Sequence, residues 1–185
     1  MINKNWAFCV CDFETTGISN ESFPIEVGCI WTDYKFNVLN TYESLVKWTA
    51  LADNSLAKNC WINEELSAFK IHNISYEHYK FFSLPVKDVV NKIKMINSNI
   101  LEKYKRIILI SDNAKFESFH MQKMYDSVTE KWDFHYCTWD TNLLLEGCGV
   151  GDPKPAHRAF ADAALLHTNI VRSLERIGYY SSIKE

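Results

Sequence analysis

The sequence lacks any uninterrupted hydrophobic run long enough to cross a bilayer, so we do not expect an integral membrane protein. It also lacks an excess of positive charge: 20 Lys and Arg against 23 Asp and Glu give a net charge of −3 and a pI of about 6.1. Proteins that hold long duplex nucleic acid usually present a broad basic surface. We therefore expect any contact with nucleic acid to be local or mediated by a metal.

The cysteines do not form the pattern of a disulfide framework. There are six, of which Cys9, Cys11 and Cys29 fall in predicted strands, and no pair has the spacing of a zinc ribbon. We expect mostly buried, reduced thiols. Residues 1–5 lead directly into the first predicted strand without a signal-peptide pattern, which favours a cytoplasmic or otherwise intracellular location.

The overall amino-acid composition is that of a folded domain. The 185 residues are 47% hydrophobic and 14% aromatic, which is enough to build a full core. Repeats, low-complexity segments and an interdomain linker are all missing from the pattern. We therefore predict a single domain over residues 1–185.

The hydrophobic pattern predicts a mixed α/β sheet flanked by helices. Three successive β-rich segments separated by short turns predict an antiparallel meander, and a short branched run without alternation predicts a buried central strand. One more strand gives a mixed five-stranded sheet. The expected strands are Trp6–Cys11, Pro24–Trp31, Phe36–Trp48, Arg106–Ser111 and Phe134–Thr138.

The expected helices alternate with the later strands. Asn73 is a predicted left-handed helix stop, Ser75 an N-cap, and Gly178 the end of the last helix. The helix that Pro85 opens has an apolar stripe at spacings of three and four. A loop with several glycines and prolines is expected over Gly147–Pro155. The expected helices are Glu64–Ile71, a short one after Ser75, one from Pro85, Ala114–Tyr125, Trp139–Glu146 and Ala159–Ile177.

The segment Asp12–Gly17 (DFETTG) follows the first buried strand directly. Residues i and i+2 of a strand point the same way, so Asp12 and Glu14 should project together, with Phe13 turned to the opposite face and into the core. Two adjacent carboxylates repel each other unless a cation lies between them, and Mg²⁺ or Mn²⁺ is the usual choice. A strand end that turns into a solvated loop is the alternative for this pair alone.

Three more residues carry charge or imidazole where packing alone would not require it. Glu117 lies in the first turns of the helix after the central strand, at the sheet edge where α/β proteins bind ligands. It is otherwise an ordinary helix-dipole glutamate. Asp162 lies among alanines, where a carboxylate is costly unless it is paired or bound to metal. His157 follows the Gly147–Pro155 loop and is either a catalytic group or a cap or surface residue.

In this order, the motifs resemble those of the DEDDh (DnaQ-like) family of 3′-5′ exonucleases, over nearly the whole chain. The segment Asp12–Gly17 looks like the family's first motif, followed by Pro24–Gly28 on the second strand. Asn113–Glu117 (NAKFE) resembles the second motif, and His157–Asp162 (HRAFAD) the third. Ile71–Ser75 is similar to a short connection in the family, so that His72 is interpreted as structural.

The second motif departs from the family pattern. It usually ends in aspartate, whereas this chain has Glu117, which makes it a DEEDh variant. Asp112 is an alternative motif acid, but the register of Asn113 and Phe116 favours Glu117. The longer side chain could shift a metal or favour Mn²⁺.

The resemblance implies a ribonuclease H-like fold and two bound Mg²⁺ or Mn²⁺ ions held by Asp12, Glu14, Glu117 and Asp162. It implies a phosphodiester hydrolysis in which His157 is the general base and nucleoside 5′-monophosphates are released from single-stranded DNA or RNA ends. Asp12 is the acid expected to bridge both metals. The residues expected near the terminal nucleotide are Thr15, Thr16, Gly17, Asn113 and Phe116.

Two other functions remain open from the sequence. One is a catalytically weak or inactive module that keeps the fold and binds nucleic acid. The other is an adaptor in which aromatic residues such as Trp48 and Trp61 dock a protein partner, although ordinary packing also explains them. A protein partner that delivers the substrate is compatible with the exonuclease itself. The sequence leaves the oligomeric state unknown.

Overall fold

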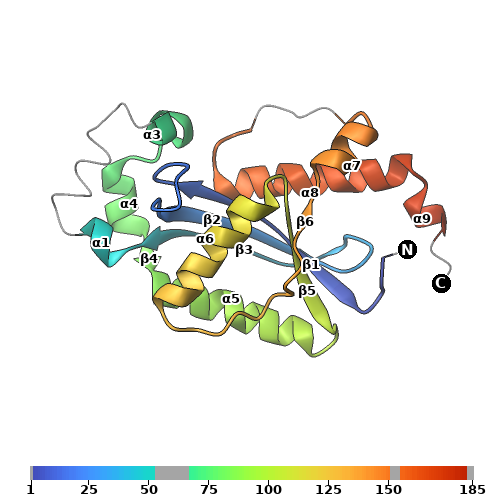
Figure 1. Ribbon diagram of the computed structural model, residues 1–185, viewed down its shortest axis with the longest axis horizontal. Coiled ribbons are helices and arrows are strands. Elements are labelled where there is room, and N and C mark those ends of the chain that lie inside the picture. Colours follow the sequence, from blue (N-terminus) through green and yellow to red (C-terminus); the bar gives the residue numbers. More distant parts are fainter. Residues whose placement is uncertain (1, 53–66, 151–154, 183–185) are drawn as a thin grey trace.

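A mixed β-sheet forms the centre of the structure, which is a computed structural model that describes residues 2–52, 67–150 and 155–182. Within these ranges the sheet has six strands in the order β4-β3-β2-β1-β5-β6 (Figure 1). The strands are β1 (Trp6–Thr15), β2 (Pro24–Thr32), β3 (Val38–Lys47), β4 (Leu84–Pro85), β5 (Arg106–Ser111) and β6 (Trp139–Asp140).

The meander of β1, β2 and β3 is antiparallel, as predicted. β1 then pairs in parallel with β5, with Val10 opposite Ile110. Parallel neighbours end at the same edge of a sheet, so Asp12 and the end of β5 lie close together. The site predicted at the end of β1 is therefore placed by the β1–β5 pair.

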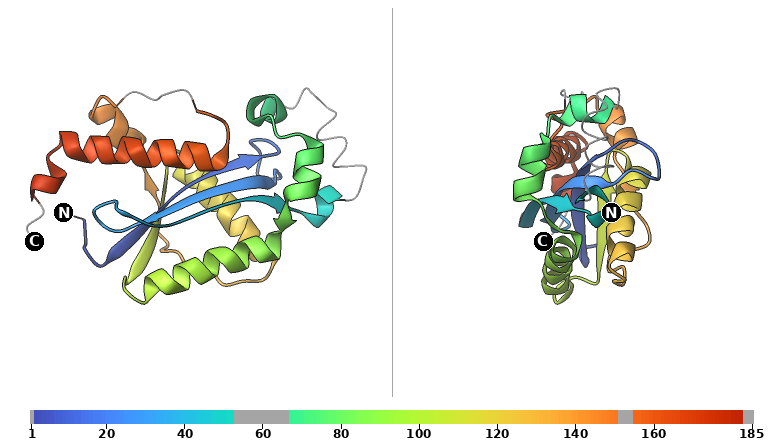
Figure 2. Two further views of the ribbon diagram at one scale, coloured as in Figure 1. Left: turned by 180° about the vertical axis from the view of Figure 1, so that it is seen from behind. Right: turned by 90° about the vertical axis from the view of Figure 1, so that its left-hand side faces the viewer.

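Helices cover both faces of the sheet, as predicted (Figures 1 and 2). Alternate residues of β1 divide between two cores. Cys9, Cys11 and Phe13 pack with α5 (Val86–Leu101) and α6 (Ala114–Ser127), and Phe8 and Val10 pack with α8 (Ala159–Arg176). The remaining helices are α1 (Thr49–Ala52), α3 (Ser67–His72), α4 (Tyr76–Phe82), α7 (Asn142–Gly147) and α9 (Tyr179–Ser182).

The helix boundaries follow the predicted signals closely. Asn73 has φ of 53° and Gly178 has φ of 68°, so both hold the left-handed conformation expected after a helix. The Ser75 hydroxyl accepts a hydrogen bond from the His78 N–H at 3.1 Å. Pro85 immediately precedes α5. No helix in the described ranges is long and apolar enough to cross a membrane.

The prediction of a strand at Phe134–Thr138 was wrong. This segment makes a backbone hydrogen bond to β5, from the His135 N–H to the Ile107 carbonyl, and β6 pairs with β5 only at Trp139–Asp140. Phe134 packs instead against Trp132 and Tyr125, with ring centroids 5.1 and 6.3 Å away. Aromatic packing therefore takes the place of the strand ladder, and α7 begins later than expected.

The thiols of Cys9, Cys11 and Cys29 are free and buried, as predicted. Burial is also the main cause that raises the pKa of the Cys9 and Cys11 thiols well above their usual value.

Several predictions concern residues outside the described ranges: Cys60, Trp61, the first three residues of the Glu64–Ile71 helix, and residues 151–154 of the Gly147–Pro155 loop. Trp48 is buried and its indole N–H donates to the Pro24 carbonyl at 2.6 Å.

Candidate active site

Asp12 and Glu14 project from the same side of β1, toward α8, while Phe13 is 5% exposed in the core on the opposite side. This is the predicted alternation. Both carboxyl groups are half-buried. The pairing of β1 with β2 shifts register between Glu14 and Thr15, and such an irregularity ends regular pairing and turns the strand.

A first group of acids forms where β1 and β5 end side by side. One carboxylate oxygen from each of Asp12, Asp112 and Glu117 lies within 4.8 Å of the others. Asn113 begins α6 by accepting a hydrogen bond from the Phe116 N–H at 3.4 Å, and this puts Glu117 in the first turn. Glu117 is 4% exposed, and its Oε2 atom has no hydrogen-bond partner in the described part of the chain.

A second group forms where the start of α8 crosses β2. Gly28 makes the crossing possible, because a Cβ atom there would lie 2.4 Å from backbone atoms of Ala159 and Phe160. Gly28 is the residue of β2 opposite Asp12. The close approach brings ligand atoms of Glu14, His157 and Asp162 within 4.8 Å of one another.

Glu26 fastens the start of α8 to the sheet. It is opposite Glu14 and 7% exposed, and both of its oxygens accept from the Arg158 guanidinium at 2.6 to 3.1 Å. Its Oε2 also accepts from the Ala159 N–H at 3.0 Å. An ion pair with two parallel contacts fixes geometry as well as charge. Glu26 therefore positions the backbone that carries His157.

His157 is held between two backbone contacts to Asp162. The Asp162 carboxylate accepts from the Ala156 N–H at 2.6 Å and from the Arg158 N–H at 3.2 Å. His157 itself has φ of 54°, a left-handed conformation that is uncommon outside glycine. Strain of this kind persists where surrounding contacts over-determine it, which is common at functional sites.

The clustered acidic groups give the site a negative electrostatic potential. Burial, followed by repulsion from Asp162, raises the pKa of Glu14 to about 8. Burial also raises the pKa of Asp12, where Glu14 and then Asp162 add to the effect, and the pKa of Glu117, where repulsion from Asp12 is the next largest cause. Hard divalent cations are the groups that such oxygens bind best. With the unpaired Glu117 Oε2 and a histidine beside two acids, the residues fit a metal centre.

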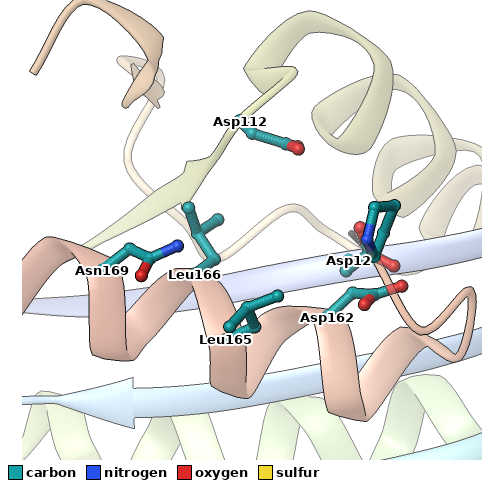
Figure 3. A pocket seen from close by; sticks show the side chains of 7 residues that line it. Asp12, Asp112, Asp162, Leu165, Leu166 and Asn169 are labelled. Carbon is teal, nitrogen blue, oxygen red and sulfur yellow. The ribbon is translucent and has the colours of Figure 1, made fainter. Parts of the chain in front are cut away.

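A cavity of about 60 Å³ lies between the two groups. Asp12, Asp112 and Asp162 contribute carboxylates to its wall, while Leu165 and Leu166 supply an apolar side. Figure 3 shows Asp12 and Asp162 beside each other, with Asp112 extending toward them from the end of β5. Asp12 is therefore a member of the first group and also lies next to Asp162 of the second group.

The loop after β1 is ordered by its own polar groups. The Thr15 hydroxyl donates to the Gly17 carbonyl at 2.6 Å, and the Thr16 hydroxyl accepts from the Phe23 N–H at 3.0 Å. Both threonines are less than 10% exposed. Asn113 and the half-buried Phe116 line a separate cavity next to this loop. Asn113 and Phe116 therefore line this cavity, whereas Thr15, Thr16 and Gly17 directly precede the loop residues that form its other wall.

Sequence reasoning treated Asp112 and Glu117 as alternatives, yet both lie within reach of Asp12. The parallel pairing of β1 with β5 is the missing information, since it brings the first residue after β5 to Asp12. The Asn142 side chain donates to the Asp112 carbonyl at 2.6 Å and holds this backbone in place. Glu26 and Arg158 were also not assigned a role, and their 132-residue separation hides the contact.

Comparison with solved structures identifies the fold. E. coli exonuclease I in complex with a dT13 oligonucleotide matches with a TM-score of 0.69 and 16% identity, over 94% of this chain and 43% of that chain. The zinc-bound complex of the same enzyme with single-stranded DNA matches with a TM-score of 0.65 and 15% identity, over 95% and 43%. This chain has the fold of the part of E. coli exonuclease I that it matches.

The predicted ribonuclease H-like architecture is therefore confirmed, with the short strand β6 in place of the longer predicted strand and with β4 as an additional strand at the opposite edge. A complex of E. coli exonuclease I with a dA16 oligonucleotide matches similarly, with a TM-score of 0.68, 15% identity and coverage of 92% and 41%. The chain spans less than half the length of these exonuclease I chains. No protein-family model and no curated protein sequence matches the chain.

Proposed function

We propose that this chain is a metal-dependent 3′-5′ exonuclease that acts on single-stranded nucleic acid. The observation that carries the proposal is the meeting of two ligand groups at one sheet edge, Asp12, Asp112 and Glu117 beside Glu14, His157 and Asp162. The fold supports the reaction class, because its solved neighbours are exonuclease I bound to single-stranded oligonucleotides and, in one structure, zinc.

Asp12, Glu14, Glu117 and Asp162 would hold two Mg²⁺ or Mn²⁺ ions, with Asp112 available as a further ligand. Such ions lower the pKa of bound water and stabilise charge on the leaving oxygen of a phosphodiester. Asp12 would serve both ligand groups, because it belongs to one group and adjoins Asp162 of the other.

His157 would accept the proton of the attacking water as general base. The oxygen of this water would then attack phosphorus as the bond to the 3′ oxygen of the preceding nucleotide breaks. That 3′ oxygen takes up a proton from solvent to become a hydroxyl, and a nucleoside 5′-monophosphate leaves. Glu14 and Asp162 lie beside the imidazole and stabilise the cation that forms when it takes the proton. The contacts from Asp162 to both sides of His157 hold its backbone for this role.

Thr15, Thr16 and Gly17 would support the terminal nucleotide through the backbone of their ordered loop, since the threonine hydroxyls already bond within it. Asn113 and Phe116, which line the neighbouring cavity, would contact the same nucleotide, with Phe116 offering a ring for base stacking. With a net charge of −3, the chain would hold only a few nucleotides of a 3′ end, or receive them from a protein partner.

The test uses single-stranded DNA and RNA labelled at the 5′ end, incubated with Mg²⁺ or Mn²⁺ and resolved on a denaturing gel. The wild type should shorten the strand stepwise from its 3′ end. Asp12→Ala should abolish shortening, and His157→Ala should reduce kcat by about 10²–10⁴-fold, the usual contribution of a general base.

Asp88→Ala and His78→Ala are matched controls, because both side chains are exposed on other elements and should leave the rate unchanged. Equal residual activity in Asp12→Ala would assign cleavage to a contaminant or to another site. A wild type that binds ends without shortening them would support a non-catalytic binding module instead.

A further inference from the structure

His120 is a buried histidine that the proposed reaction does not use. Its side chain is fully buried in α6, and neither ring nitrogen has a hydrogen-bond partner among the described residues. A buried polar group without a partner is costly, and an apolar residue of similar shape would avoid that cost. The position therefore retains two polar atoms that packing does not need.

Aromatic rings surround His120. The Phe116 and Phe119 rings meet it edge-on at centroid distances of 4.4 and 5.2 Å, and the Phe13 ring lies 6.4 Å away. Phe13 follows Asp12 directly, and Phe116 precedes Glu117. His120 thus lies one layer behind the acidic site, between β1 and the surface of α6.

His120 also lines a cavity of about 380 Å³ next to the acidic site. Its other walls are the loop after Gly17 and the outer side of α6: Ile18, Ser19, Asn20, Asn113, Lys115, Phe116 and Phe119. Lys123 keeps the loop in place through hydrogen bonds to the Asn20 and Ser22 carbonyls at 3.1 and 2.7 Å. The space is large enough for one planar heterocycle, with apolar rings on one wall.

We infer that His120 is a specificity-determining residue that binds the edge of a substrate nucleobase in this cavity, an inference that rests on the proposed exonuclease function. Phe119 is 38% exposed at the wall of this cavity, and the proposed contact requires its ring to rotate away from the imidazole. Phe116 and Phe119 then flank the base, and the exposed Lys115 faces its phosphate.

The chemistry of the imidazole suits a base edge. Burial, with a smaller effect from Lys123, lowers the pKa of His120 to about 4, so the ring is neutral at pH 7. A neutral imidazole has one N–H donor and one nitrogen acceptor. Nucleobase edges present donors and acceptors side by side, so one base can satisfy both nitrogens.

The experiment measures binding without cleavage. Fluorescence anisotropy gives the Kd for a labelled oligothymidylate, with Ca²⁺ in place of Mg²⁺ and the probe checked for intactness, and for the same strand with abasic sites at its 3′ end. The variants are His120→Phe and the surface control His78→Phe. His120→Phe should weaken binding of the normal strand by about tenfold, the value of one or two hydrogen bonds.

The abasic strand should bind His120→Phe and wild type equally, and the Tm of His120→Phe should rise because the unpaired nitrogens are gone. Equal binding of the normal strand by both proteins would overturn the inference and leave His120 as a core residue. An equal loss on both strands would overturn it as well, by pointing to the backbone, and so would a wild type that binds neither strand. Because this assay measures binding alone, a wild type that binds here but does not shorten the strand in the gel assay would refute the exonuclease and leave the base contact standing.

Discussion

At the end of β1, single acidic residues have pKa values raised well above those of carboxyl groups at an ordinary, solvated strand end. The Glu14 pKa is raised to about 8, first because the carboxyl group is partly withdrawn from water and then because it faces Asp162 and Glu26. Asp12 and Glu117 are shifted in the same direction, mainly by burial. The site is therefore most stable either protonated or bound to cations.

This gives a defined dependence of stability on pH. Glu14 has a folded-state pKa of about 8 against an ordinary value of 4.5, so the folded protein binds the proton more tightly. The stability that protonated Glu14 contributes is fully present below pH 4.5 and is lost as the pH rises through about 8. Without metal, the Tm should fall across this interval, and Mg²⁺ or Mn²⁺ should raise it more at pH 8 than at pH 5.

Thermal unfolding with and without EDTA, across this pH range, measures the effect. Glu14→Gln removes the titrating group and should flatten the decline, whereas Glu21→Gln on the exposed loop should not. A metal-free Tm that rises across the interval, or a metal effect that is equal at both pH values, would contradict the account.

For single residues, the sequence predicted to which face of a strand a side chain points. It did not predict which side chains from distant segments lie close together. Alternation along β1 was enough to place Asp12 and Glu14 together and Phe13 in the core. Nothing in the local pattern shows that Asp112, like Glu117, lies within 4.8 Å of Asp12. That proximity depends on parallel pairing between strands 100 residues apart, as between Val10 and Ile110.

Among the elements, α8 decides whether the two ligand groups meet. Its first residues touch β2 at Gly28, and Glu26 binds Arg158 and the Ala159 N–H. His157 and Asp162 lie on either side of this junction. Small changes there should act on catalysis without removing a ligand.

Gly28→Ala should displace α8, because the added Cβ would lie 2.4 Å from backbone that cannot rotate away. Overpacking of this kind costs about 1–3 kcal/mol, and cleavage should fall with it as Asp162 moves from Asp12. Gly147→Ala is the matched control, since its Cβ meets nothing within 4 Å. Denaturant unfolding and cleavage rates compare the two, and equal stability would refute the packing argument.

Glu26→Gln should lower kcat by about 10–100-fold, the usual effect of losing a residue that orients a metal ligand, with a smaller change in KM, because Glu26 fixes the start of α8, which carries Asp162 as well as His157. The neutral amide cannot keep both contacts to the Arg158 guanidinium. Glu130→Gln makes the same change in the surface pair with Lys94 and should leave kcat unaltered. Steady-state kinetics of both variants decide the point, and an unchanged kcat in Glu26→Gln would show that the ion pair does not position His157.

The sequence predicted most elements because their signals are local. The caps at Asn73, Ser75 and Gly178 needed no knowledge of the fold. Phe134–Thr138 failed because its residues have strand propensity, while packing of Phe134 on Trp132 and Tyr125 competes with pairing to β5. Tertiary contacts decide such segments.

Across the whole molecule, one buried hydrogen-bond chain joins the sheet to the helices beneath it. The Trp31 indole N–H donates to the Asn97 side chain at 2.8 Å, and Asn97 and the Tyr125 hydroxyl both donate to Asp133 at 2.8 Å. This series of hydrogen bonds links β2, α5 and α6. It lies on the face of the sheet away from α8.

Asn97→Ala should destabilise the protein by about 1–3 kcal/mol, because it leaves the Trp31 N–H buried without a partner. Chemical denaturation measures this, with Asn91→Ala on the exposed side of α5 as control. Cleavage by the folded variant should stay near the wild-type rate. A large loss of activity at full stability would mean that this network reaches the site, contrary to our description.

The most direct test of the central claim is release of nucleoside 5′-monophosphates from single-stranded DNA and RNA, followed over time by chromatography. With Mg²⁺ or Mn²⁺ the wild type should release them one at a time. The wild type in EDTA should release none, and Asp12→Ala should release none with either metal. Release that persists in EDTA or in Asp12→Ala, or a wild type that releases none with either metal, would contradict the account.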